Sequence, residues 1–350
     1  MADNIKKILE LNDIKASAPC RIDLGGTLDI KTFYYPLRHF MPCTFNIALD
    51  LRTHVKLLPF EDKKVKITSH GFENAEFYLD KAPFDHPLGL MFAIASYFLA
   101  GGGVHIVIES SSPPKSGLGG SSAAAIALVA AFSKLLNHTG EAEISKKDTA
   151  ILAHAIEESV AGVPCGLQDQ LAAAYGGVNA WYWKAGLTES IFKKKQIYNE
   201  KESKDLEKRI LIAYCGIPHE SKDVNSKWVK QFLAGKNRNL WIEIAQCANS
   251  FIEALSRYDF QMGASIMNKE TRIRQKMTPE VLDGVGVKLV DSAVKNRCGA
   301  RFTGAGGGGC IWALGEENNI TELKTEWENI VKKNKNASIL NTKIDLKGVL

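Results

Sequence analysis

The segment SSPPKSGLGGSSAAAIALVAAF, residues 111–132, combines residue types that can bind a phosphate group. Its glycines let the backbone come close to a ligand, and two serines stand where an Ala-rich helix begins. The start of a helix offers unpaired N–H groups and the positive end of its dipole. Ser121 and Ser122 could simply cap the helix, but a cap does not require three glycines in four positions. The segment therefore indicates an anion site, most simply for the phosphates of a nucleotide.

This segment differs from two common nucleotide-binding loops. A Walker A loop has a Lys directly before its hydroxyl residue, and the segment has none there. A dinucleotide fingerprint has its third glycine where Ser122 stands, and an acidic residue on a second strand is also missing at the expected distance. The segment is therefore neither of these loops.

Two carboxylates in residues 156–183 could take part in catalysis or bind a metal. Glu157 lies near the end of a predicted helix, twelve residues before Asp169. A carboxylate in the first turn of a helix is often only a cap or a partner of the dipole. Glycine and alanine surround the Gln-Asp-Gln triplet at 168–170, which leaves little bulk there and suits the floor of a pocket. Glu158 points about 100° away from Glu157 around the helix.

The segment KASAPCRIDLGGTLDIKTF, residues 15–33, places charges on a predicted strand. Arg21 and Asp23 lie on one face of that strand, so this face must meet water, a ligand or a partner charge. Two glycines break the strand, and Asp29 follows in a turn. Taken alone, an ordinary surface strand with a glycine turn explains this pattern equally well.

A third glycine-rich segment, GARFTGAGGGGCIWALG, spans residues 299–315. It fits G-x-G-x-x-G literally, but a strand follows it rather than the helix that a Rossmann unit requires. The alternative is a glycine-rich hairpin that approaches the backbone of another segment closely.

In chain order these segments resemble the three motifs of the GHMP small-molecule kinases, which include galactokinase, homoserine kinase, mevalonate kinase and phosphomevalonate kinase. Pro113 and Gly117 match the family's P-x-x-x-G-L-G-S-S-A loop, with Gly120 in place of the first Ser. The sequence A-P-C-R at 18–21 matches the first motif. A-G-x-P-C-G-x-x-D-Q looks like the region around the galactokinase catalytic Asp, and G-x-Q-D-Q-x-A-A-A-x-G-G looks like the heptose-phosphate kinases. The hairpin resembles the third motif, which closes against the phosphate loop and the substrate.

The resemblance implies a role for each matching residue. Asp169 and Arg21 are catalytic: Asp169 is the catalytic carboxylate, and Arg21 stabilises the transferring phosphoryl group. Ser121 and Glu157 hold the metal. The remaining predicted residues bind ATP (Pro113, Lys115, Gly117, Leu118, Gly119, Gly120, Ser121, Ser122 and Ala123) or the substrate (Asp29, Gly26, Gln168, Gly304, Ala305 and Gly306).

The implied reaction is Mg2+-dependent transfer of the ATP γ-phosphoryl group to a sugar hydroxyl. Carboxylates and amides in the acceptor segments suit a polyol, and the first expectation is the anomeric hydroxyl of galactose or a similar hexose. The alternative is a heptose 7-phosphate, which needs a further basic cluster, with Arg38 and Lys222 as candidates. A non-catalytic ATP and sugar sensor is a third possibility, but the presence of Arg21, Glu157 and Asp169 argues against it.

The expected fold is α+β in two lobes. By the resemblance, residues 1–190 form an ATP-binding lobe like the second domain of ribosomal protein S5, and residues 191–350 form a ferredoxin-like α+β lobe. Short alternating strands are predicted at 44–51, 54–60, 64–70 and 75–79. Helices are predicted at 88–100 and 146–160, and four more between 223 and 295. A β-loop-β-α-β pattern ends the chain.

Composition and charge indicate the expected class of partner and the expected cellular compartment. The chain has 350 residues, 45% hydrophobic and 24% charged, with a net charge of +5. No dense Lys/Arg block suggests nucleic-acid binding, and no apolar run approaches the length of a membrane span. The amphipathic N-terminus contains acidic residues, unlike a targeting peptide. The seven cysteines contain no C-x-x-C pair. We therefore expect a cytoplasmic monomer or homodimer that acts on a small molecule.

Overall fold

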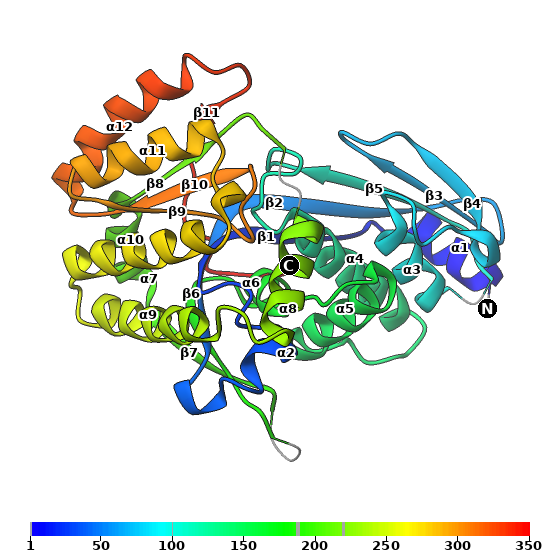
Figure 1. Cartoon of the computed structure of the whole chain (residues 1–350). Coiled ribbons are helices and arrows are strands. Elements are labelled where there is room, and N and C mark those ends of the chain that lie inside the picture. Colours follow the sequence, from blue (N-terminus) through cyan, green and yellow to red (C-terminus); the bar gives the residue numbers. More distant parts are fainter. Residues whose placement is uncertain (1, 100, 187–189, 219–220) are drawn as a thin grey trace.

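The computed structural model describes residues 2–99, 101–186, 190–218 and 221–350 (Figure 1). It contains two sheets with helices packed against both, so the predicted α+β architecture is confirmed. The large sheet has the order β4-β3-β5-β2-β6-β7, and β1 pairs with β2 outside this path. Its strands are β1 (Ile14–Leu24), β2 (Cys43–Pro59), β3 (Lys64–Ser69), β4 (Ala75–Tyr78), β5 (Val104–Ser110), β6 (Val178–Trp183) and β7 (Phe192–Tyr198).

Helices α4 (Gly120–Asn137) and α6 (Gln168–Tyr175) pack on the large sheet, and α3 (Gly89–Phe98) and α5 (Lys146–Ala161) pack on α4. Helix α4 packs on β1 and β2 and contacts α3, α5 and α6, which makes it the central helix of this lobe. Short helices occur at α1 (Ala2–Leu11), α2 (Lys31–Tyr34), η1 (Arg38–Phe40) and η2 (Leu79–Lys81).

Within the described ranges, α4 is long and apolar enough to span a membrane by length and composition, contrary to the expectation that no segment is. Its alanine content raises its hydropathy, yet 67% of it is buried inside the protein. Burial against the strands and the neighbouring helices accounts for its apolar character.

The second sheet has the order β11-β8-β10-β9, with every pair antiparallel. In chain order this is 4-1-3-2, the arrangement expected for a ferredoxin-like lobe. Figure 1 shows α11 and α12 on one side of this sheet and α9 and α10 on the other. The strands are β8 (Ile210–Tyr214), β9 (Gly299–Phe302), β10 (Cys310–Leu314) and β11 (Ser338–Ile339). The helices are α7 (Glu200–Leu206), η3 (Glu207–Arg209), α8 (Ser221–Leu233), α9 (Arg238–Ser256), α10 (Phe260–Met277), η4 (Pro279–Val281), α11 (Gly284–Lys295) and α12 (Glu317–Val331).

The two strands predicted at 44–51 and 54–60 are one long strand, β2. A register shift occurs opposite Pro19 and Cys20, where the pairing passes from Arg52 to Leu49. One half of β2 pairs with β6 and the other half with β5, so both halves stay extended in one sheet. The polar residues between the two apolar runs mark this irregularity rather than a turn.

The large sheet extends beyond the expected boundary at residue 190. Strand β7 pairs with β6, and the last residues return to the same lobe. Leu350 exchanges backbone hydrogen bonds with Ser17 at 3.0 and 2.9 Å, and Gly177 donates to the Asp345 carbonyl at 2.6 Å. We refer to residues 343–350 as the C-terminal strap. The first lobe therefore contains chain from both ends of the sequence.

Candidate active site

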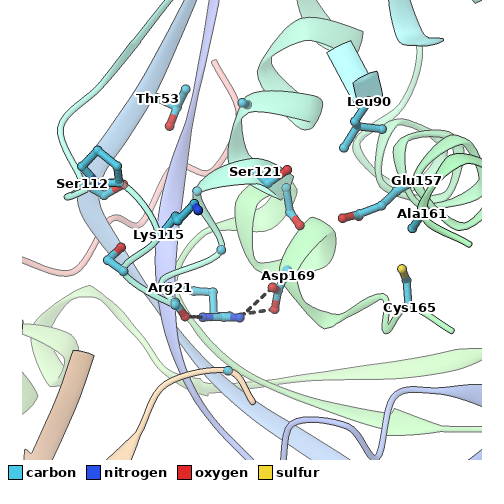
Figure 2. Close-up of a pocket in the computed structure, with 18 of the residues that line it drawn as sticks. Arg21, Thr53, Leu90, Ser112, Lys115, Ser121, Glu157, Ala161, Cys165 and Asp169 are labelled. Atoms are coloured by element: carbon cyan, nitrogen blue, oxygen red, sulfur yellow. Dashed lines mark hydrogen bonds and ion pairs between the residues drawn. The ribbon is translucent and has the colours of Figure 1, made fainter. Parts of the chain in front are cut away.

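A cavity of about 470 Å3 brings the predicted motifs together. Its walls come from the glycine-rich loop, the start of α3, the end of α5, the start of α6 and the hairpin between β9 and β10. Figure 2 shows Ser121, Glu157, Asp169, Arg21 and Lys115 arranged around this space.

The glycine-rich loop joins β5 to α4. Gly117 and Gly119 have φ angles of +73° and +74°, a conformation that glycine adopts at little cost. Gly119 is the N-cap of α4, and no side chain caps the helix. Ser121 is exposed and Ser122 is buried. Neither serine acts as the cap, because no side chain forms the capping hydrogen bond. The first N–H groups of α4 therefore remain available to an anion.

Two other segments form backbone hydrogen bonds with the glycine-rich loop. The Arg21 N–H donates to the Leu118 carbonyl at 2.9 Å, and the Cys310 N–H donates to the Ser116 carbonyl at 2.9 Å. The glycine-rich hairpin thus contacts the loop directly, as its sequence predicted. Leu118 and Ala123 are buried and do not line the cavity. They support the loop through packing.

Asp169 and Arg21 form a two-point ion pair at the cavity floor (Figure 2). Arg21 Nε donates to Asp169 Oδ1 at 2.7 Å, and Nη2 donates to Oδ2 at 2.6 Å. Arg21 Nη1 donates to the Gly117 carbonyl at 2.6 Å. The Arg21 side chain is 4% exposed, whereas 24% of the Asp169 side chain is exposed. Burial acts to lower the pKa of Arg21, but Asp169 and Asp23 outweigh it and raise this pKa, so the guanidinium stays charged.

Asp29 and Gln168 lie together on another wall of the cavity. The Gln168 N–H donates to Asp29 Oδ2 at 3.0 Å, and Asn46 Nδ2 donates to Gln168 Oε1 at 3.1 Å. Burial raises the pKa of Asp29 to about 7 despite that backbone hydrogen bond. A side chain at Gly166 would overlap the Asp29 carboxylate, which explains the glycine there.

Glu157 and Glu158 point in different directions, as the helical spacing predicted. The Glu157 carboxylate lines the cavity and accepts a hydrogen bond from Gln170 Nε2. Glu158 is exposed and lies 3.4 Å from Lys31 Nζ.

The cavity offers hard oxygen donors that fit Mg2+. The Ser121 hydroxyl and the Glu157 carboxylate both line it. No group of three or more His, Cys, Asp or Glu residues is placed to hold a metal in the part of the chain that the structure describes. This agrees with Mg2+, which usually takes one or two carboxylates together with substrate phosphates and water.

Two predicted substrate residues do not line the cavity. Gly26 lies against Asp23, and a Cβ added to it would be only 2.6 Å from Asp23 Oδ2. The Gly26 carbonyl accepts a hydrogen bond from Arg274. Gly306 packs on Val281, where an added Cβ would lie 2.5 Å from the carbonyl oxygen. Both glycines permit close packing behind the site, whereas Gly304 and Ala305 do line the cavity.

The chain is similar in sequence to known proteins. Residues 89–177 match the family described as GHMP kinases N terminal domain. The chain is 28% identical to D-glycero-alpha-D-manno-heptose 7-phosphate kinase of Campylobacter jejuni, over 86% of this chain and 89% of that protein. It is 27% identical to mevalonate kinase of Pyrococcus horikoshii, over 86% of this chain and 88% of that protein.

Solved structures show the same fold. Lactococcus lactis galactokinase complexed with galactose superimposes with a TM-score of 0.74 at 18% identity, covering 100% of this chain and 98% of that one. Streptococcus pneumoniae phosphomevalonate kinase gives 0.71 at 14% identity, covering 95% and 99%. Residues 89–177 therefore match a GHMP kinase N-terminal domain, and the whole chain has the fold of these kinases. The similarity to the heptose phosphate kinase and the galactokinase also supports the predicted resemblance to the sugar-kinase branch.

The cavity includes residues that the sequence did not reveal. An apolar part is formed by Phe72, Leu88, Leu90, Met91 and Ile108. They come from a turn, a helix start and a strand whose patterns are typical of ordinary core positions, so only the fold brings them together. Asn225 on α8 also lines the cavity, and its buried Oδ1 accepts no hydrogen bond from any described residue.

Of the two residues considered for a second phosphate site, only Arg38 has a described side chain. Arg38 is exposed, donates to the Tyr35 carbonyl at 3.1 Å and does not line the cavity. The Lys222 side chain lies outside the described residues.

Proposed function

We propose that this protein is a GHMP kinase that transfers the γ-phosphoryl group of ATP to a hydroxyl of a sugar, with Mg2+ as cofactor. The observation that carries the proposal is the Asp169 carboxylate. It is fixed at two points by Arg21, partly exposed in the cavity, and adjacent to the glycine-rich loop.

The loop supplies the phosphate site in this proposal. No side chain caps the start of α4, so its first N–H groups would bind the phosphates, and Lys115 in the same loop lines the cavity and would add a positive charge. Ser121 and Glu157 would hold the metal. Mg2+ bound to the phosphates would neutralise charge that develops during transfer.

Asp169 acts on the acceptor. Phosphoryl transfer relies mainly on positioning and charge stabilisation, so a fixed carboxylate that accepts a hydrogen bond from the attacking hydroxyl aids catalysis directly. Arg21 donates hydrogen bonds from Nε and Nη2 to Asp169 and from Nη1 to the Gly117 carbonyl. Its main effect in this proposal is therefore to fix the Asp169 carboxylate and the glycine-rich loop.

A polyol suits the rest of the cavity. Asp29, Gln168 and the unpaired Asn225 Oδ1 provide polar atoms for several hydroxyl groups. A site built on such hydrogen bonds discriminates against acceptors that lack the hydroxyls. A free hexose such as galactose is the first candidate, supported by the galactokinase-like motif. A heptose 7-phosphate is the second, supported by the Campylobacter jejuni relative.

A panel of acceptors tests this proposal. The protein is incubated with ATP, Mg2+ and, separately, free hexoses, heptose 7-phosphate, mevalonate, phosphomevalonate and homoserine, and the products are identified by phosphorus NMR. We expect turnover of a sugar at its anomeric hydroxyl. Turnover of mevalonate or homoserine without any sugar would exclude the sugar proposal, and ATP binding without any turnover would favour a sensor.

Asp169→Asn tests the catalytic residue. We expect kcat to fall by about 100-fold or more, because a carboxylate that assists proton transfer contributes roughly two to four orders of magnitude. Nucleotide affinity, measured by calorimetry, should stay within a few-fold. A variant whose kcat remains within about tenfold of the original, about 1.4 kcal/mol of barrier, would exclude Asp169 from this role.

A further inference from the structure

Behind the cavity floor, buried side chains of alternating charge connect the two lobes. Starting from Asp169 and Arg21, the series continues through Asp23, Arg301, Glu270 and Arg274. The last four side chains are 0% exposed. Asp169 on α6 and both Arg21 and Asp23 on β1 belong to the first lobe. Arg301 on β9 and both Glu270 and Arg274 on α10 belong to the second.

Asp23 lies at the junction of this series. Its Oδ1 accepts from the Gly304 N–H at 2.7 Å and lies 3.7 Å from Arg21 Nη1. Its Oδ2 accepts from Arg301 Nη1 at 3.2 Å. Gly26 is a glycine because its Cβ would collide with the same carboxylate. One buried side chain therefore contacts both the residue that fixes Asp169 and the hairpin that lines the cavity.

At the end of the series away from the cavity, Glu270 and Arg274 have several hydrogen-bond partners. Arg301 Nε donates to Glu270 Oε2 at 2.9 Å, and Arg274 Nε donates to Glu270 Oε1 at 2.8 Å. Arg274 Nη2 donates to the Gly26 carbonyl at 2.6 Å, and its guanidinium lies between 4.7 and 4.8 Å from the rings of two tryptophans, Trp241 and Trp228. Burial acts to raise the pKa of Glu270, but Arg301 and Arg274 outweigh it, so the carboxyl is ionised.

The charges along the series cancel. Three carboxylates alternate with three guanidinium groups, so each buried charge has an oppositely charged neighbour. A buried ion pair adds little to stability compared with apolar packing, but it can fix one arrangement of the groups that share it. Such an arrangement is needed here, because a misplacement of about 1 Å can reduce turnover by about 100-fold.

We propose that Asp23 is a positioning residue that sets the relative placement of Arg21 and the Gly304 hairpin. Through Arg21 it orients the Asp169 carboxylate toward the acceptor. Asp23 does not line the cavity, so it acts on the reaction only through these neighbours. The inference rests on the proposed function for the role of Asp169.

The first variant is Asp23→Asn, which retains an oxygen for the Gly304 N–H but removes the charge that faces Arg21 and Arg301. We expect kcat to fall by about 100-fold, while the affinity for an ATP analogue with Mg2+ changes less than about threefold. Tyr198→Phe is the control. It removes a buried hydrogen bond to the Leu255 carbonyl, 2.6 Å long and outside the series, so it should lower the melting temperature and leave kcat unchanged. A kcat of Asp23→Asn within threefold of the original would overturn the proposal.

A second variant separates positioning from stability. Asp23→Asn leaves three guanidinium groups with two carboxylates, and Asp23→Asn/Arg301→Gln restores equal numbers. We expect the melting temperature of the double variant to recover toward that of the original protein, while its kcat stays low. Recovery of both together would show that Asp23 only stabilises the fold.

A crystal structure of the double variant provides a readout that needs no acceptor. We expect the Arg21 guanidinium to move away from its two-point pairing with Asp169. An unchanged pair, with distances of 2.7 and 2.6 Å, would contradict the proposal whatever the substrate is. Failure of the proposed function would instead appear in the acceptor panel.

Discussion

At the scale of single residues, two adjacent glutamates provide a matched pair. Glu157 lines the cavity and Glu158 bonds Lys31 on the surface, although both belong to α5. We expect Glu157→Gln to raise the Mg2+ concentration needed for half-maximal activity by about tenfold, because one charged metal ligand is lost. Glu158→Gln should leave this concentration unchanged. Magnesium titrations of both variants measure the difference, and equal effects would contradict the assignment of Glu157.

Asp29 makes stability depend on pH. Burial raises its pKa to about 7 from 3.8, so the folded protein binds this proton more tightly than the unfolded chain does. The resulting stabilisation is fully present below about pH 4 and is lost as the pH rises to about 7. Asp29→Asn removes this contribution. The free energy of unfolding of the original protein should therefore fall relative to the variant between pH 4.5 and 7.5.

Urea denaturation at several pH values checks this prediction. The difference between the two proteins isolates Asp29, because every other titrating group is common to both. A constant difference across this range would show that Asp29 has the same pKa in the folded and unfolded states.

At the scale of elements, the hairpin between β9 and β10 supports the glycine-rich loop. An added Cβ at Gly309 would lie 2.5 Å from the Ser116 carbonyl oxygen, whereas at Gly307 the nearest atom would be 3.8 Å away. Both glycines have positive φ angles, +84° and +76°, so alanine costs roughly 1–2 kcal/mol of backbone strain at either position. The two variants therefore differ mainly in their contact with the loop.

We expect Gly309→Ala to raise the KM for ATP by about tenfold or more, because the loop must move to admit the methyl group. Gly307→Ala should lower the melting temperature but change this KM by less than about twofold. Steady-state kinetics of the two variants measures both effects. Equal KM values would show that the hairpin does not hold the loop in its binding conformation.

At the scale of the whole molecule, the C-terminal strap joins the end of the chain to β1, β2 and α6. Asp345 forms an ion pair with Arg52, and their side chains are 8% and 12% exposed. Asp345 Oδ1 also accepts from the Lys347 and Gly348 N–H groups at 2.9 and 3.0 Å. The strap therefore adds a buried polar connection between segments far apart in the sequence.

We expect Asp345→Asn to lower the free energy of unfolding by about 3 kcal/mol, because Arg52 would be left largely buried without its counter-charge. Asp13→Asn is the control. Asp13 is half exposed and pairs with Lys15 and Lys56 in solvent, so its loss should leave the urea midpoint unchanged. Equal midpoints for the two variants would show that the strap contributes nothing to stability.

Several local parts of this protein could be predicted from short stretches of sequence. The glycines of the phosphate loop, the Ala-rich helix after it and the hairpin at 304–309 could be predicted, because backbone freedom and helix propensity act over a few residues. The separation of Glu157 from Glu158 also followed from helical spacing alone. The three motifs, read in chain order, predicted the family and its two-lobe fold.

How these parts meet could not be predicted, because it depends on contacts between distant segments of the packed fold. Arg21 and Asp169 are 148 residues apart, and Asp23 and Arg301 are 278 apart, so no local pattern links them. The same holds for Gly26 and Gly306, whose sequence suggests a ligand but whose neighbours are a carboxylate and a backbone carbonyl. Partners of this kind are chosen by burial, because a charge removed from water must find its counter-charge wherever the packed fold places one.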